Sequence, residues 1–157
     1  MANVALRPVE DADLDALFEQ MRDPVSVRMA AFTAKDPDDR AAFDAHMSKV
    51  RALPDVTMRT VTRDGRVVGS IASFVVGGCT EITYWIDRAV WGQGVASQAL
   101  ALLLDVVAVR PLHARAASDN VGSLMVLHKA GFRPIGTEMS YANGRGEEIE
   151  ETVLRLG

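Results

Sequence analysis

Two glycines mark the part of this sequence best suited to chemistry. The run Trp91-Gly92-Gln93-Gly94-Val95-Ala96-Ser97 follows a β-rich segment and leads into an apolar helical one. Glycine permits a tight turn whose amides can point at an anion, and the first amides and dipole of the next helix attract negative charge. We interpret the loop as a pyrophosphate site, the alternative being a turn that only reverses the chain. The loop lacks the lysine of a Walker loop and the third glycine of a dinucleotide fingerprint.

A second block follows at Asn120-Val121-Gly122-Ser123 and ends at Gly131-Phe132. The two blocks resemble the signatures of the GCN5-related N-acetyltransferase (GNAT) superfamily, Gln/Arg-x-x-Gly-x-Gly/Ala and then Asn-x-x-Ala/Ser with a terminal Gly-Phe. Trp91 replaces the first polar residue. With Glu81-Ile82-Thr83-Tyr84-Trp85-Ile86-Asp87, the chain is similar to the ribosomal-protein N-terminal acetyltransferase (RimJ/RimL-like) branch over nearly its whole length.

The resemblance implies a fold and a cosubstrate. The expected fold is α+β, with a single mixed, mostly antiparallel sheet of six to seven strands and about four helices. The cosubstrate is acetyl-CoA, whose pyrophosphate would bind the backbone amides of residues 93–97. The strand end at Tyr84, Trp85 and Ile86 should splay from the next strand at a bulge and expose backbone groups to the pantetheine amides. Asn120 would hydrogen-bond the pantetheine arm, and its alternative role is a helix N-cap.

The implied reaction is direct attack of an amine on the thioester, which needs a proton acceptor and stabilisation of an oxyanion. Glu81 is the expected base, acting through water; its alternative is an exposed strand carboxylate. Many family members place a tyrosine where this chain has Leu127. A thiol with a pKa of about 8.5 can leave without that acid. Ser123 could bond the sulfur or the oxyanion, or simply allow close helix packing.

These residues predict an acetyl-CoA-dependent N-acetyltransferase acting on a primary amine, either a peptide N-terminus or a small molecule. Leu127 keeps a second hypothesis open, a non-catalytic sensor with the same fold that binds acyl-CoA. A Rossmann-type enzyme for a phosphate ligand is a third. The aromatic side chains of Tyr84, Trp85 and Trp91 could equally be packing residues. The histidines and Cys79 lack metal-ligand spacing, so no metal site is predicted.

The elements that position these residues follow from local patterns. Alternation and β-branched residues predict strands at 4–9, 56–62, 66–76, 79–87, 112–118, 132–141 and 147–156. Helical spacing predicts helices at 14–21, from an Asp36-Pro37 cap to Pro54, from Val95 to Arg110-Pro111, and at 121–130. The span 23–35 is expected to be a loop that, with the turn at 141–146, walls the acceptor side.

Length and composition narrow the class of protein. A chain of 157 residues with 48% hydrophobic and 24% charged residues fits one globular domain, 1–157. A net charge of −4 disfavours nucleic acid as a partner and suits a cationic amine. No signal peptide or membrane-spanning run is seen, and a single cysteine allows no internal disulfide, so we expect a cytoplasmic protein. A homodimer is left open.

Overall fold

The computed structural model describes residues 3–157 and contains one seven-stranded sheet in the order β1-β2-β3-β4-β5-β7-β6. Neighbouring strands are antiparallel except β4 and β5, which are parallel. The sheet is therefore mixed and mostly antiparallel, as the resemblance implied. Its strands are β1 (Val4–Pro8), β2 (Thr57–Arg63), β3 (Arg66–Val76), β4 (Cys79–Ile86), β5 (Leu112–Ala117), β6 (Arg133–Ala142) and β7 (Glu147–Leu156).

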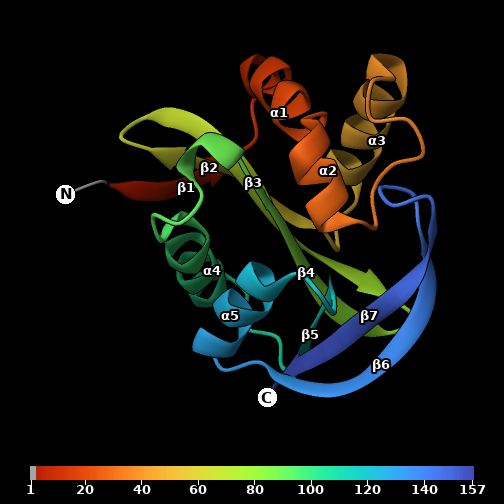
Figure 1. Cartoon of the computed structure of the whole chain (residues 1–157). Helices are drawn as coiled ribbons and strands as arrows, with labels where there is room; N and C mark the ends of the chain where they lie inside the picture. The colour runs from red at the N-terminus through yellow and green to blue at the C-terminus, as the bar shows by residue number, and fades with distance from the viewer. Residues whose placement is uncertain (1–2) are drawn as a thin grey trace.

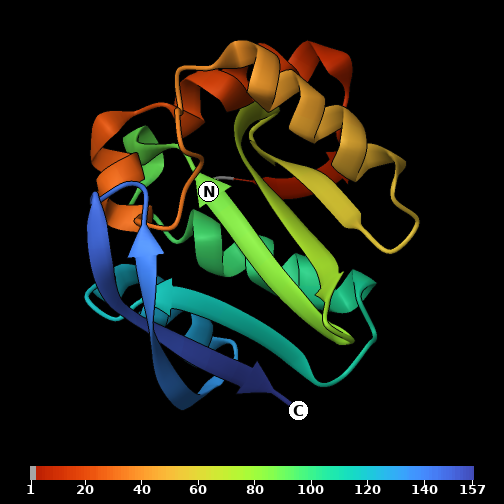
Figure 2. The same ribbon diagram turned by 90° about the vertical axis from the view of Figure 1, so that its right-hand side faces the viewer.

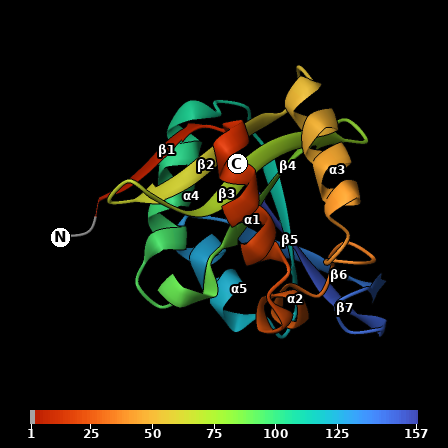
Figure 3. The same cartoon turned by 90° about the horizontal axis from the view of Figure 1, so that it is seen from above.

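Helices cover both faces of the sheet (Figures 1 and 3). One face carries α1 (Leu14–Met21), α2 (Pro24–Ala30) and α3 (Arg40–Ala52). The other carries α4 (Val95–Val106) and α5 (Val121–Lys129). Short 3₁₀ turns, η1 (Asp11–Asp13) and η2 (Arg88–Val90), precede α1 and α4. The two faces of the sheet can therefore present different chemistry at the same strand.

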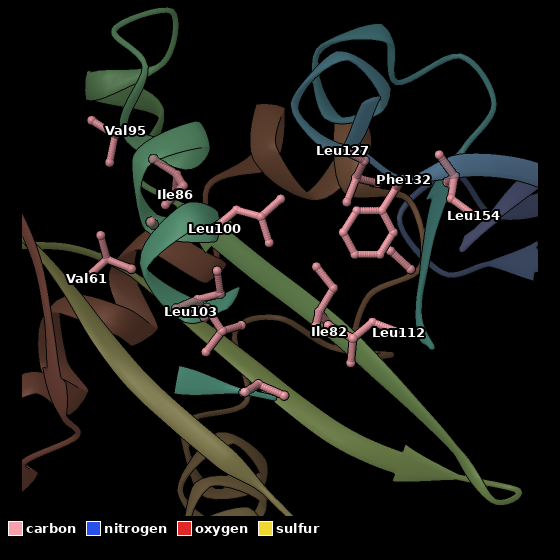
Figure 4. Close-up of a cluster of buried hydrophobic side chains, with 14 of the residues drawn as sticks. Val61, Ile82, Ile86, Val95, Leu100, Leu103, Leu112, Leu127, Phe132 and Leu154 are labelled. Atoms are coloured by element: carbon pink, nitrogen blue, oxygen red, sulfur yellow. The ribbon is translucent and has the colours of Figure 1, made fainter. Parts of the chain in front are cut away.

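The main core lies between the sheet and the α4–α5 layer (Figure 4). The apolar stripe of α4 packs Leu100 and Leu103, both fully buried, toward the sheet. Burying a leucine side chain stabilises the fold by about 1.5–3 kcal/mol. The partners that surround this stripe come from segments between β2 and β7: Val61, Ile82, Ile86, Leu112, Leu127, Phe132 and Leu154.

The structure corrects three predictions about helices. The span 23–35, predicted as a loop, contains α2, because Asp23 accepts a hydrogen bond from the Ser26 amide at 3.0 Å and Pro24 occupies the first turn. The next helix begins at Arg40 behind an Asp39 cap, since Asp36 instead accepts the Asp38 amide in a turn. With α2, five α-helices lie within residues 3–157, and the expected fold class is confirmed. The helix α4 ends at Val106, before the predicted Arg110-Pro111, in a run of β-branched residues that favour extended backbone.

Strands β4 and β5 diverge soon after they meet (Figure 2). They pair only at Thr80 with Leu112 and at Glu81 with His113. Beyond that point β5 stays paired with β7 as far as Ala117. The expected splay is present, but its expected cause is wrong: β4 pairs with β3 without a register shift from Gly69–Ile86 to Val76–Cys79. The opening arises because β5 follows β7 in the twisted sheet, and not from a bulge in β4.

Candidate active site

The glycine loop stands at the open end of this divergence. Gly92 and Gly94 have φ angles of 76° and 78°, in the left-handed region that glycine tolerates best. Gly94 is the N-cap of α4, and no side chain caps the helix or places a carboxylate in its first turn. A side chain added at Gly92 would meet nothing within 4 Å. The first amides of α4, at Val95, Ala96 and Ser97, are therefore free of side-chain acceptors and can bind an anion.

Trp91 ties this loop to the end of β4. Its indole Nε1 donates to the carbonyl oxygen of Ile86 at 2.8 Å. That carbonyl points away from β3, and by alternation so do the backbone groups of Tyr84 and Ile82. These groups face the opening, where β5 has left β4. The strand end thus presents unpaired polar backbone beside the glycine loop.

Trp85 is oriented differently from its neighbours. A side chain added at Gly69 of β3 would come within 2.1 Å of the Trp85 carbonyl oxygen, so that carbonyl faces β3. The Trp85 indole Nε1 donates to the carbonyl of Gln20 in α1 at 3.0 Å. Trp85 therefore anchors α1 to the sheet, and its carbonyl is not offered to the opening.

Tyr84 and Ser123 meet on the α4–α5 face. The two hydroxyl oxygens lie 2.8 Å apart, joining β4 to the first turn of α5. Burial raises the pKa of the Tyr84 phenol, and the hydrogen bond with Ser123 offsets part of that effect. The phenol is therefore protonated at neutral pH and can act as a donor. Leu127, one turn further along α5, is buried in the core.

Asn120 caps α5. Its side-chain oxygen accepts from the Ser123 amide at 3.2 Å, and its amide donates to the Met29 carbonyl of α2 at 3.4 Å. The capping role left open by the sequence is thus present in the structure. The contact with pantetheine implied by the resemblance stays a prediction.

Glu81 faces the opposite side of the sheet from Tyr84, because the two lie three residues apart on one strand. Its side chain is 15% exposed and sits 3.5 Å from Arg115 of β5. Arg115 also pairs with Glu138 at 2.8 Å and with Glu151 at 3.2 Å. Glu81 and Ser123, the two predicted catalytic residues, are thus placed on opposite faces of the β4–β5 opening.

This group of four, Glu81, Arg115, Glu138 and Glu151, holds more carboxylates than guanidinium groups. Burial raises the pKa of Glu151, and the hydrogen bond with Arg115 opposes that rise. The hydrogen bond to Glu138 is the main reason that the pKa of Arg115 is raised. The sequence did not single out Arg115, Glu138 and Glu151, which come from β5, β6 and β7. They share a face because Glu151 pairs with Ala117, two residues from Arg115, and with Glu138.

The turn between β6 and β7 docks on the chain around α2. That these two segments wall the acceptor side stays a prediction. The Asn143 side chain donates to the Thr33 carbonyl, and the Gly144 amide donates to the Ala31 carbonyl, both at 2.8 Å. Arg145 donates two hydrogen bonds, of 2.8 and 2.9 Å, to the carboxylate of Asp119. The turn, α2 and the start of α5 therefore form one connected edge around the β4–β5 opening.

Two cavities are lined by elements other than β4 and β5. One of about 620 Å³ is bounded by α1, the start of β3 and η2, and its lining includes Gln20, Arg66 and Arg88. The other, of about 520 Å³, is an apolar hollow between α5 and the β6–β7 pair. Neither is lined by the predicted catalytic residues.

Most of the chain matches one family model. The family model described as "Acetyltransferase (GNAT) domain" matches residues 3–133. The chain belongs to the GNAT acetyltransferase family. A relative in Bacillus licheniformis, named an uncharacterized N-acetyltransferase p20, is 24% identical over 163 aligned residues, covering 98% of this chain and 92% of its own length. The curated relatives of this member of the GNAT family are named as N-acetyltransferases.

Solved structures share the fold. RimJ of Mycobacterium smegmatis, in complex with CoA-disulfide, has a TM-score of 0.81 at 24% identity, covering 98% of this chain and 81% of its own. Spermidine N-acetyltransferase from Vibrio cholerae, in complex with CoA and spermine, has a TM-score of 0.79 at 15% identity. The match covers 97% of this chain and 95% of that enzyme. No helix formed by residues 3–157 of this GNAT protein is long and apolar enough to cross a bilayer.

Proposed function

We propose that this protein transfers the acetyl group of acetyl-CoA to a primary amine. The observation that carries the proposal is the uncapped start of α4, behind Gly92 and Gly94, directly beside the opening between β4 and β5. Acetyl-CoA supplies a thioester carbonyl that an amine can attack. The amides of residues 93–97 bind its pyrophosphate, and the outward backbone of Ile82 and Tyr84 pairs with its pantetheine amides. The CoA-bound relatives RimJ and spermidine N-acetyltransferase support this choice of cosubstrate.

The proton acceptor and the hydrogen-bond donor of the reaction lie on different faces of the opening. Glu81 accepts the proton that the attacking amine must lose, through a water molecule. Ser123, held by Tyr84, donates a hydrogen bond on the other face, to the oxyanion or to the leaving sulfur. This division fits an amine that arrives on the α2 side while the cosubstrate lies against α4 and α5.

The acceptor is a cationic amine. Glu81, Glu138 and Glu151 surround a single guanidinium, that of Arg115, so the acceptor face carries excess negative charge. Both peptide N-termini and polyamines satisfy this chemistry. Solved structures of the same fold include a ribosomal-protein-alanine N-acetyltransferase from Brucella melitensis and the spermidine N-acetyltransferase. Reaction in the cytoplasm, where acetyl-CoA is made and consumed, fits the proposal.

A panel assay tests the activity. The protein is incubated with acetyl-CoA and with peptides bearing free N-termini, polyamines or small-molecule amines, and release of the CoA thiol and the mass of the product are measured. We expect transfer to at least one class. Glu81→Gln should lower kcat by about 10²-fold, and Glu148→Gln, at an exposed position, serves as the matched control.

One observation favours a second candidate, a sensor that binds acyl-CoA without turnover. Leu127, at the position where many relatives have a tyrosine, is buried in the core and offers no proton. Saturable binding of acetyl-CoA with no transfer to any amine in the panel would favour the sensor. Absence of CoA binding would contradict both functions.

A further inference from the structure

The glycine loop carries no positive charge of its own. Residues 91–98 contain neither lysine nor arginine, and the whole chain has a net charge of −4. A diphosphate bound at this loop must rely on backbone amides alone or on a cation supplied by another part of the fold. The structure contains such a cation.

Arg63, the last residue of β2, reaches the loop from outside it. Its Nη1 donates a hydrogen bond to the side-chain oxygen of Gln93, the residue between the two glycines. Arg63 shares a face of β2 with Val61, and Val61 is buried in the core under α4. Side chains alternate along a strand, so Arg63 necessarily points to the α4 side.

The backbone of Arg63 is fixed from both sides. It pairs with Val4 of β1 and with Arg66 of β3, across the tight Asp64-Gly65 turn. Asp64 and Gly65 have φ angles of 52° and 82°, as the Asp-Gly pattern predicts for this hairpin. The guanidinium is therefore held on rigid strands rather than on a mobile loop.

The guanidinium of Arg63 has donor capacity to spare. Its Nε is buried without a hydrogen-bond partner. Within residues 3–157 no carboxylate lies at ion-pair distance from it. Arg88, also near the loop, differs because Asp23 pairs with it at 2.8 Å. Arg63 thus presents a full positive charge to a neutral amide.

We propose that Arg63 is a phosphate-binding residue, whose guanidinium exchanges Gln93 for the diphosphate oxygens of the cosubstrate. The proposal rests on acetyl-CoA binding at the loop, as inferred above. The exchange is favourable because a phosphate is an anion that can accept two parallel hydrogen bonds from the guanidinium, whereas the Gln93 side chain is neutral and accepts one. Without a bound ligand, the side-chain oxygen of Gln93 accepts a hydrogen bond from the guanidinium and holds it beside the loop.

Calorimetric titration with CoA and with dephospho-CoA, which keeps the diphosphate but lacks the 3′-phosphate, tests this role. Arg63→Gln should weaken both ligands by about 10-fold or more and reduce the dependence of Kd on salt concentration. Arg66→Gln makes the same charge change on the same hairpin and should weaken them by less than about 2-fold. Arg63→Lys, which keeps the charge without the fork, should fall between wild type and Arg63→Gln.

The outcomes separate this inference from the proposed function. If the wild-type protein fails to bind CoA, the proposed function is wrong. If it binds CoA and the Arg63→Gln and Arg66→Gln variants lose affinity equally, only the role of Arg63 is overturned. A loss seen with CoA but not with dephospho-CoA would also overturn it, since the contact would then be to the 3′-phosphate. Melting temperatures measured without ligand show whether each variant is folded. If Arg63→Gln does not fold, the affinity of Arg63→Lys is compared with that of Arg66→Gln instead.

Discussion

The phenol oxygen of Tyr84 lies 2.8 Å from the hydroxyl oxygen of Ser123. This contact joins β4 to α5 on one face of the opening where β4 and β5 separate, while Glu81 faces the other side beside Arg115. An acetyl transfer to an amine requires one proton to leave the nucleophile and stabilisation of charge at the thioester. In the function proposed above, the two groups of side chains serve these separate needs and do not compete for the same proton.

The Tyr84–Ser123 contact should act as a unit. Ser123→Ala is expected to lower kcat by about 10–100-fold with little change in CoA affinity, and Tyr84→Phe to cause a smaller fall, because the phenol acts through the serine. Each change should cost about 1 kcal/mol of stability through the lost hydrogen bond. Steady-state kinetics of both single variants and the double variant measure the coupling. Strictly additive losses in log kcat would show that the two hydroxyls act independently.

A carboxylate at Ser97 should change stability and cosubstrate affinity in opposite directions. Ser97→Asp places a negative charge in the first turn of α4, where the helix has no acidic residue. We expect the free energy of unfolding to rise by about 0.3–1 kcal/mol and CoA to bind at least about 10-fold more weakly. Ser97→Asn, of the same shape, is the control. Urea denaturation and CoA titration give the two readings, and unaltered CoA affinity in Ser97→Asp would place the pyrophosphate elsewhere.

The docking of the β6–β7 turn on α2 depends on Gly144. A methyl group there would lie 2.3 Å from the Val27 carbonyl oxygen, so Gly144→Ala must push the turn away. We expect the free energy of unfolding to fall by about 1–3 kcal/mol. The KM for the amine should rise, while the affinity for CoA should not change. Gly136→Ala, on the same hairpin but with nothing within 4 Å, is the matched control. Equal melting temperatures and KM values for the two variants would argue against the packed turn.

Asp13 should make stability depend on acid pH. Arg7 donates two hydrogen bonds of 2.7 Å to its carboxylate, and these, with donors from Thr60 and the Glu10 amide, lower the pKa of this buried group to about 2. A lowered folded-state pKa means that the stabilisation is present at neutral pH and is lost as pH falls from about 4 towards 2.

Asp13→Asn should therefore be less stable than wild type by about 2 kcal/mol at neutral pH, and the difference should shrink as the pH approaches 2. Urea denaturation of both proteins at a series of pH values measures this difference in the free energy of unfolding. Asp11→Asn is the comparison, because Asp11 pairs with Arg51 at the surface, where such pairs are worth less than about 1 kcal/mol. A constant difference between Asp13→Asn and wild type across this pH range would contradict the ionised Arg7–Asp13 pair.

Local sequence was enough to predict most elements and the glycine loop. Strands β3 and β7 have the predicted bounds because alternation and turn residues agree there. The prediction failed where the signal was brief: α2 is only seven residues long, and its Asp23-Pro24 start was read as part of a loop. The same Asp-Pro pattern at Asp36 made a turn instead, because Asp39 provided the cap.

The sequence alone determined the family, through two short blocks whose glycines and asparagine are needed for backbone conformation and capping. Only the tertiary structure decided which side chains meet. Glu81 faces Arg115 because β4 and β5 pair at their start, Tyr84 reaches Ser123 because they then diverge, and Arg63 touches Gln93 across 30 positions. Such contacts depend on strand order and register, which are set by packing of the whole sheet rather than by local pattern.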